Sequence, residues 1–194
     1  MRVKKQSAYI KIEGSATAGR RQMTKTGRGV GEKLAPLKIG RTNGETQTKR
    51  ILVPVKGDVI DDEAMRLAFT YAMAKLGKGR NVAVDVVYVV AVPHALPLNA
   101  ELHQETERGE RALDHAETVA REMGLHVESS LLQARSPGAA IVDMSRESGA
   151  ELIVMATSYE SKLGELDLGR TIPYVLKNAP CRVWVCRAPM AEST

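Results

Sequence analysis

Short apolar runs alternate with longer stretches of helical spacing over residues 51–186. The runs are rich in β-branched residues, whereas the stretches between them repeat apolar side chains at intervals of three and four, the spacing of one helix face. The pattern predicts strands at 51–55, 82–92, 125–133, 151–156 and 182–186. It predicts helices between successive strands, at about 63–76, 103–123, 137–148 and 172–179.

Local signals indicate where several of the helices begin and end. Ser136 is a good N-cap and Pro137 suits a first turn, and Gly149 follows as a stop signal. Thr171 is placed to cap the last helix, after a polar loop over residues 157–169.

Strands separated by helices predict an α/β fold with a five-stranded, parallel-type sheet and helices on both faces. Ligands of such sheets bind at the carboxyl ends of the strands, where the strand order reverses. The candidate binding residues therefore follow strands one, two and four, at 56–58, 89–92 and 157–169.

Charge is divided unevenly along the chain. Residues 1–50 hold 13 Lys and Arg against three Glu, whereas the remainder holds 15 basic and 20 acidic residues. The first fifty residues have few large apolar side chains, so they cannot bury enough apolar surface to offset their ordering entropy. We expect a disordered basic tail over 1–48, with one strand between Val3 and Ile12, then a folded domain over 49–188 and a short tail over 189–194.

Composition excludes several classes of protein. The 194 residues contain no run of about 18 apolar residues and no apolar stretch of signal-peptide length near the N-terminus, so we expect a cytoplasmic protein without membrane insertion. Two cysteines do not build a disulfide scaffold, and the four histidines lack the spacing of metal ligands. No serine has the context of a nucleophile elbow. We therefore expect neither a metal site nor an enzyme.

Three stretches of the sequence resemble the universal stress protein family. They are Ile51-Leu-Val-Pro-Val-Lys-Gly57, Gly149-Ala-Glu-Leu-Ile-Val-Met155, and Leu168-Gly169 followed by Asn178-Ala-Pro-Cys-Arg-Val183. The resemblance covers about residues 49–188 and implies a Rossmann-like fold of the adenine nucleotide alpha hydrolase-like type. It also implies a UspA-like stress-response protein that is dimeric and cytoplasmic and that regulates rather than catalyses.

The same resemblance implies a site for ATP that this sequence does not keep. ATP-binding members carry Gly-x-x-Gly, nine residues, then Gly followed by Ser or Thr after the fourth strand, and these glycines let the backbone approach the phosphates. The matching positions are Ala156, Tyr159, Gly169 and Arg170, of which only Gly169 agrees, and Lys56 replaces the Asp that ends the first strand. A Lys side chain only donates hydrogen bonds, whereas Asp accepts them. We expect no ordinary ATP binding and no cofactor.

Two alternatives stay open at this site. One is a nucleotide switch that binds ATP or AMP, with Mg²⁺, through a degenerate loop. The other is a different phosphorylated ligand, attracted by Lys56, Arg170 and the helix start at Thr171. Against the second alternative, Lys56 is expected to pair with Asp58 or Asp61, and Arg170 with Glu165 or Asp167. The candidate nucleotide-binding residues are Pro54, Val55, Lys56, Val90, Met155, Ala156, Ser158, Tyr159, Gly169, Arg170 and Thr171.

Partner contacts are expected near both ends of the chain. The last strand is expected to be a sheet edge, so Val183, Trp184 and Val185 are candidates for a homodimer contact. Residues 1–50 are a candidate for nucleic-acid association through phosphate contacts without sequence preference. The leading hypothesis is a non-catalytic, dimeric stress-response domain that acts through an unknown protein partner.

Overall fold

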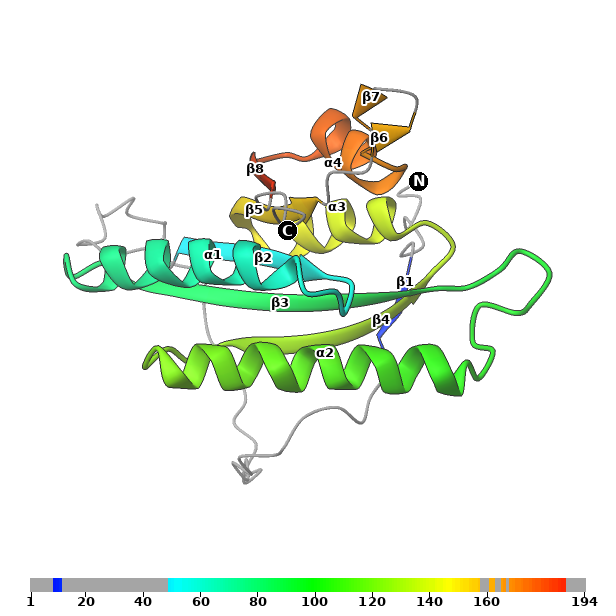
Figure 1. Cartoon of the computed structure of the whole chain (residues 1–194), viewed down its shortest axis with the longest axis horizontal. Helices are drawn as coiled ribbons and strands as arrows, with labels where there is room; N and C mark the ends of the chain where they lie inside the picture. Colours follow the sequence, from blue (N-terminus) through cyan, green and yellow to red (C-terminus); the bar gives the residue numbers. More distant parts are fainter. Residues whose placement is uncertain (1–8, 12–48, 158–160, 163–164, 167, 188–194) are drawn as a thin grey trace, which may run out of the picture.

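The computed structural model describes residues 9–11, 49–157, 161–162, 165–166 and 168–187 (Figure 1). The elements, in chain order, are β1 (Tyr9–Lys11), β2 (Lys49–Val55), α1 (Asp61–Leu76), β3 (Val82–Ala91), α2 (His103–Glu122), β4 (Glu128–Ala134), α3 (Pro137–Ser148), β5 (Ala150–Thr157), β6 (Ser161–Lys162), β7 (Glu165–Leu166), α4 (Thr171–Asn178) and β8 (Arg182–Arg187).

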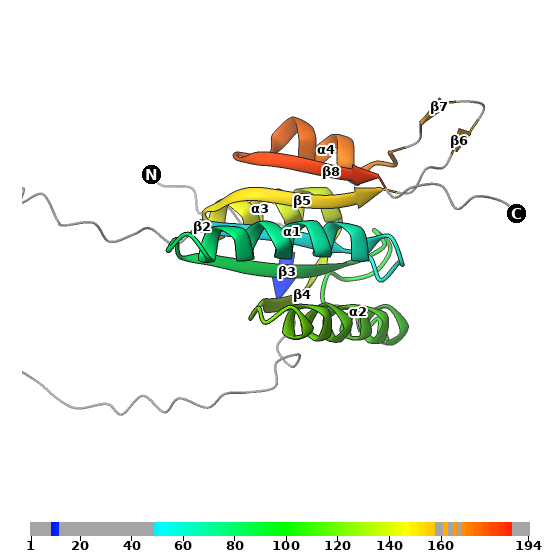
Figure 2. The same cartoon turned by 60° about the vertical axis from the view of Figure 1, so that its left-hand side comes forward.

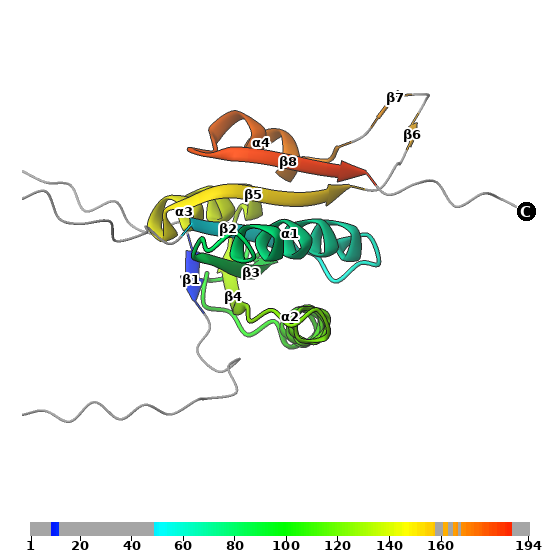
Figure 3. The same cartoon turned by 90° about the vertical axis from the view of Figure 1, so that its left-hand side faces the viewer.

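Five parallel strands form the centre of the fold, in the order β4-β3-β2-β5-β8. Helices α1 and α2 cover one face of this sheet, and α3 and α4 cover the other (Figures 2 and 3). This arrangement confirms the α/β architecture predicted from the alternation of apolar runs and helical stretches. The chain adds β3 and β4 on one side of β2 and then continues with β5 on the other side, so the strand order reverses between β2 and β5.

Two short elements extend the predicted architecture. Strand β1 pairs antiparallel with the outer edge of β4, with Tyr9 opposite Ala134 and Lys11 opposite Leu132, so the sheet has six strands rather than five. The strand expected between Val3 and Ile12 is thus part of the main sheet. Strands β6 and β7 form a separate antiparallel pair beyond the carboxyl end of β5, where the sequence predicted only a polar loop (Figure 2).

Alternate side chains of each strand enter two separate apolar layers. In β2, Val53 packs in the layer below α1 and α2, which also holds Phe69, whereas Leu52 packs in the layer below α3 and α4. All three side chains are fully buried. Because both faces of the strands are covered, the strand sequences read as continuous apolar runs.

One ionised pair lies against the core at the amino end of the sheet. The Arg50 guanidinium donates hydrogen bonds of 3.0 and 3.2 Å to the two carboxylate oxygens of Asp85, a residue of β3 that is only 3% exposed. The charge of Asp85 raises the pKa of Arg50. The carboxylate is therefore buried with its charge balanced.

Several predictions fall outside the described residues. They concern residues 1–48 other than β1, the tail over 189–194, and the candidate ligand contacts Ser158 and Tyr159. The domain limits and the role of the basic segment therefore stay predictions. Among the helices of the described residues, none is both long and apolar enough to cross a membrane.

Candidate ligand-binding site

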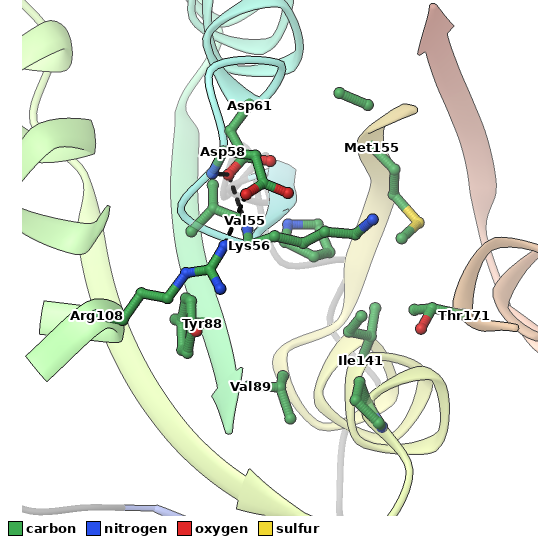
Figure 4. A pocket seen from close by; sticks show the side chains of 13 residues that line it. Val55, Lys56, Asp58, Asp61, Tyr88, Val89, Arg108, Ile141, Met155 and Thr171 are labelled. Atoms are coloured by element: carbon green, nitrogen blue, oxygen red, sulfur yellow. Dashed lines mark hydrogen bonds and ion pairs between the residues drawn. The ribbon is translucent and has the colours of Figure 1, made fainter. Parts of the chain in front are cut away.

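A cavity of about 360 Å³ opens at the carboxyl end of the sheet, beside the reversal of strand order between β2 and β5 (Figure 4). Its position is the one expected for ligands of parallel α/β sheets. The lining residues are Pro54, Val55, Lys56, Asp58, Asp61, Tyr88, Val89, Arg108, Pro137, Ile141, Met155, Ala156 and Thr171.

The loop between β2 and α1 forms one wall of this cavity, and Asp61 fixes its shape. The Asp61 Oδ2 atom accepts hydrogen bonds from the backbone N–H groups of Lys56 (2.8 Å), Gly57 (2.8 Å) and Asp58 (3.1 Å). Burial raises the pKa of the Asp61 carboxyl group, and the three N–H donors act in the opposite direction. The Asp61 carboxyl group thus stabilises the conformation of the loop.

Arg108 of α2 holds the same loop from the outside. Its guanidinium donates a hydrogen bond of 2.7 Å to Asp58 Oδ1. The side chain also crosses Gly57, where a Cβ atom would lie 3.4 Å from Arg108 Nε. Gly57 has a φ of +79°, which disfavours any other residue. The Asp58–Arg108 pair and the Asp61 contacts therefore fix the backbone of the loop that carries Lys56.

Apart from Asp58, the residue of this loop that lines the cavity is Lys56, whose side chain extends into the cavity toward β5 and the start of α4 (Figure 4). The predicted ion pair of Lys56 with Asp58 or Asp61 is wrong. Asp58 pairs with Arg108, and the oxygen of Asp61 that faces the loop accepts backbone N–H groups. Within the described part of the chain the Lys56 amine has no hydrogen-bond or ion-pair partner. The Lys56 amine is therefore available to a negatively charged group.

The other walls of the cavity are apolar and aromatic. Val89, Ile141 and Met155 line the side near α3 and α4. Tyr88 lies between the cavity and α2, is 5% exposed, and has a pKa raised by burial. Helix α2 comes this close to Tyr88 because residue 109 is glycine, where a Cβ atom would lie 2.6 Å from Tyr88 Cδ1. The cavity therefore offers an apolar surface beside a cation.

A second cavity, of about 580 Å³, adjoins the first across Pro137 and Thr171, which line both. It lies between the loop after β3, the turn before α3 and the start of α4, and its basic lining residues are His94, Arg135 and Arg170. No acidic residue of the described ranges lines it. It therefore provides a positive environment next to Lys56.

The two arginines of the second cavity have different roles. The Arg135 guanidinium donates hydrogen bonds to the backbone carbonyl groups of Val92 (3.3 Å) and Pro93, so it holds the loop after β3. Arg170 precedes α4 and makes no ion pair with a side chain of the described residues. The side chains of Glu165 and Asp167, its expected partners, lie outside those residues.

The structure brings most of the predicted contact residues to these two cavities. Pro54, Val55, Lys56, Met155, Ala156 and Thr171 line the first, and Arg170 and Thr171 line the second. Gly169 directly precedes Arg170 and has a φ of +62°. Val90 lies in the core below α2, and its neighbours Tyr88 and Val89 line the cavity instead. The sequence alone did not identify Tyr88 or Arg108 as site residues. The available signal was Gly109, a glycine inside a charged helix, which follows Arg108 and packs against Tyr88.

The edge of the sheet carries the residues expected to contact a second copy. Strand β8 is the last in the sheet order, and Val183, Trp184 and Val185 are half-buried. The Trp184 ring meets Tyr71 of α1 edge-to-face, with 5.0 Å between ring centroids. No group of three or more His, Cys, Asp or Glu side chains among the described residues is arranged to hold a metal ion.

Comparison with known proteins decides the family. The sequence profile of the universal stress protein family matches residues 47–187, which is most of the chain. The chain belongs to this family. A universal stress protein of Methanocaldococcus jannaschii is 32% identical to it over 156 residues, which cover 77% of this chain and 88% of the relative. The resemblance in the three sequence stretches is thereby confirmed.

Solved structures of family members share the fold at lower identity. A universal stress protein from Archaeoglobus fulgidus has a TM-score of 0.59 and 22% identity, and the match covers 71% of this chain and 97% of that one. A structure of the Archaeoglobus fulgidus universal stress protein in complex with dAMP has a TM-score of 0.55 and 20% identity, and covers 72% and 98% of the two chains. At this identity the likeness supports the fold alone.

Proposed function

We propose that this chain is a non-catalytic regulatory domain that binds a negatively charged small ligand and does not bind ATP in the manner expected of glycine-motif family members. The observation that carries the proposal is Lys56, whose amine enters the first cavity without a partner among the described residues. A relative that binds dAMP supports a ligand site on this fold.

The chemistry of Lys56 explains why the ligand differs. An Asp at this position accepts hydrogen bonds from the hydroxyl groups of a sugar, whereas a Lys amine offers three donors and a positive charge. A ribose hydroxyl placed against Lys56 can accept a hydrogen bond, but its own O–H group finds no acceptor on the Lys amine. A phosphate or carboxylate placed there gains a charge-assisted hydrogen bond. Thr171 at the start of α4 and Arg170 beside it extend the same preference toward the second cavity.

The side chains that line the first cavity supply no catalytic pair. Asp61 is held by three backbone N–H groups, and Asp58 is held by Arg108. A nucleophile needs an adjacent base that is free to take its proton. Neither carboxylate is free in this sense, so we propose that the site binds its ligand without converting it.

Isothermal titration of the full-length chain tests the proposed ligand class. We expect pyrophosphate to bind the wild type at least fivefold more tightly than it binds Lys56→Met, because that substitution keeps the aliphatic stem and removes the charge. Lys78→Met, in the turn after α1, is the matched control and leaves the affinity unchanged. Equal affinity of the wild type and Lys56→Met for pyrophosphate contradicts the role of Lys56.

Titration with Mg-ATP tests the second half of the proposal. We expect the wild type to bind Mg-ATP with a Kd above about 1 mM, an affinity near −4 kcal/mol. We expect the quadruple variant Lys56→Asp, Ala156→Gly, Tyr159→Gly, Arg170→Ser to bind Mg-ATP at least tenfold more tightly. It restores the hydrogen-bond acceptor at position 56 and the glycine motif. Micromolar binding by the wild type contradicts the proposal.

We further propose that two copies associate through β8. Within the described residues this strand pairs only with β5, so one of its edges has no strand neighbour. Such an edge is a template for pairing with a second copy. We expect sedimentation velocity to show a dimer for the wild type and a monomer for Val183→Glu. Val59→Glu, which changes a residue that is 89% exposed, is the control. A monomeric wild type contradicts this part.

A further inference from the structure

Strand β1 lies outside the part of the chain that the family profile matches. The family profile begins at residue 47, whereas β1 spans Tyr9–Lys11 and pairs with the outer edge of β4. Without it, that edge would have no strand neighbour among the described residues. An uncovered edge presents a row of unpaired N–H and C=O groups, which favours docking of another strand.

The backbone of β4 shows which pair of residues carries the docking. The Ala134 carbonyl oxygen accepts a 2.9 Å hydrogen bond from the Val92 N–H group, on the side of β4 that faces β3. Backbone groups alternate in direction along a strand. The N–H and C=O groups of Gln133 therefore face the outer edge, where Ile10 is the register partner.

The same end of β4 anchors the loop that follows β3. The Gln133 side-chain amide donates a hydrogen bond of 2.7 Å to the Ala100 carbonyl group, and Arg135 donates to the Val92 and Pro93 carbonyl groups. Gln133 is only 6% exposed. Because this loop forms one wall of the second cavity, a strand docked on β4 supports that wall.

The length of chain between β1 and β2 permits the strand to leave and return. From Tyr9 to Lys11 the strand runs toward the amino end of the sheet, where β2 also begins, three strand positions away. That gap is about 14 Å. The 37 residues from 12 to 48 have a covalent reach of roughly 120 Å. A three-residue pairing is weak by itself, so it depends on the tether for its occupancy.

We propose that the outer edge of β4 is a docking site for an extended segment, and that Tyr9–Lys11 of the same chain is its resident, detachable occupant. Its release exposes the edge and removes the support of the loop after β3. The basic N-terminal segment is thereby coupled to the wall of the second cavity.

Amide hydrogen exchange of the full-length chain tests the resident role. In Ile10→Pro, the central residue of β1 loses its N–H group, so we expect the Gln133 amide to exchange at least tenfold faster than in the wild type. The control Thr17→Pro makes the same chemical change outside β1 and should leave Gln133 unchanged, and Ile153 of β5 should be unaffected in both variants. Unchanged exchange at Gln133 in Ile10→Pro overturns the proposal.

A labelled peptide of residues 7–13 tests the docking site in the same full-length chains. Fluorescence anisotropy should show at least tenfold tighter binding to Ile10→Pro than to the wild type, whose own strand occupies the edge. The tether supplies an effective concentration of about 1 mM, so the peptide should bind Ile10→Pro with a Kd below about 1 mM. Equal affinity for both chains, or no binding to either in this concentration range, overturns the proposal. Protection of Gln133 in the wild type that rises with protein concentration also overturns it, because the occupant would then come from a second copy.

Discussion

Replacing Gly109 by Ala tests how closely α2 approaches the sheet. A Cβ atom at this position would lie 2.6 Å from Tyr88 Cδ1 and 2.8 Å from Leu131 Cδ1. Tyr88 is 5% exposed and Leu131 is 1% exposed, so neither side chain can swing into solvent without leaving the core. The new methyl group therefore forces either a shift of α2 or a change in both side chains.

The expected size of the effect follows from two opposing terms. Ala is favoured over Gly in a helix interior by about 1 kcal/mol. Overpacking a buried site costs about 1–3 kcal/mol, and contacts below 3 Å to two buried side chains place Gly109→Ala at the upper end of that range. We expect a net loss of about 2 kcal/mol in the free energy of unfolding.

Urea denaturation of the full-length chain at 25 °C measures this loss. Glu110→Ala, the neighbouring exposed position on α2, is the control and should change the free energy by less than about 0.5 kcal/mol. Combining Gly109→Ala with Tyr88→Ala should destabilise less than the two single changes together, since the second change removes the closest contact. An increase in stability of about 1 kcal/mol for Gly109→Ala would mean that helix propensity alone decides, and the packing argument would be refuted.

Three further predictions concern stability. Asp85→Asn removes the charge opposite Arg50, whose side chain is 33% exposed, so urea denaturation should show a loss of about 1–3 kcal/mol in the free energy of unfolding. This is less than the cost of breaking a fully buried pair, and a loss below about 0.5 kcal/mol contradicts the prediction. Burial raises the pKa of Asp61 above its ordinary value of 3.8, so the native state holds this proton more tightly than the unfolded state does. The stability of the wild type relative to Asp61→Asn should therefore be greatest below about pH 3.8 and fall as the pH rises through the native pKa, and a difference that grows over that window contradicts the shift. Gly149 ends α3 with a φ of +68° and has open space around it. In thermal unfolding, Gly149→Ala should therefore lower the free energy of unfolding by about 1 kcal/mol, and Gly149→Asn should lower it by less. Equal losses for the two variants contradict a backbone cause.

The elements that sequence predicted best are those fixed by local chemistry. The Ser136 hydroxyl accepts from the Ala139 N–H group, Pro137 opens α3, and Gly149 ends it in the left-handed conformation, as the sequence indicates. The alternation of apolar runs and helical stretches was enough to predict the parallel sheet and the edge at which the cavity opens. None of these inferences required knowledge of contacts between distant residues.

The ion pairs at the site depend on such distant contacts, and there the sequence misled. Asp58 and Asp61 are close to Lys56 along the chain, which made them its expected partners. The fold instead brings in Arg108 from α2, fifty residues after Asp58, and turns Asp61 toward the backbone. Lys56 is left to the cavity as a result. Proximity in sequence predicted the cap of α3, but not that of α4, whose N-cap is Arg170 rather than the expected Thr171. It also does not show which distant cation competes for a carboxylate.

Strand β3 shows a second limit, which concerns direction rather than distance. Val84, Val86, Tyr88 and Val90 enter the layer below α1 and α2, whereas Val87 and Val89 enter the layer below α3 and α4. Both layers are apolar, so the valines of the run do not reveal which side chains face a ligand. Val90 was therefore a reasonable candidate from sequence, yet it is covered by the core, and Val89 lines the cavity. In a strand that is buried on both faces, only the register against its neighbours can decide this choice.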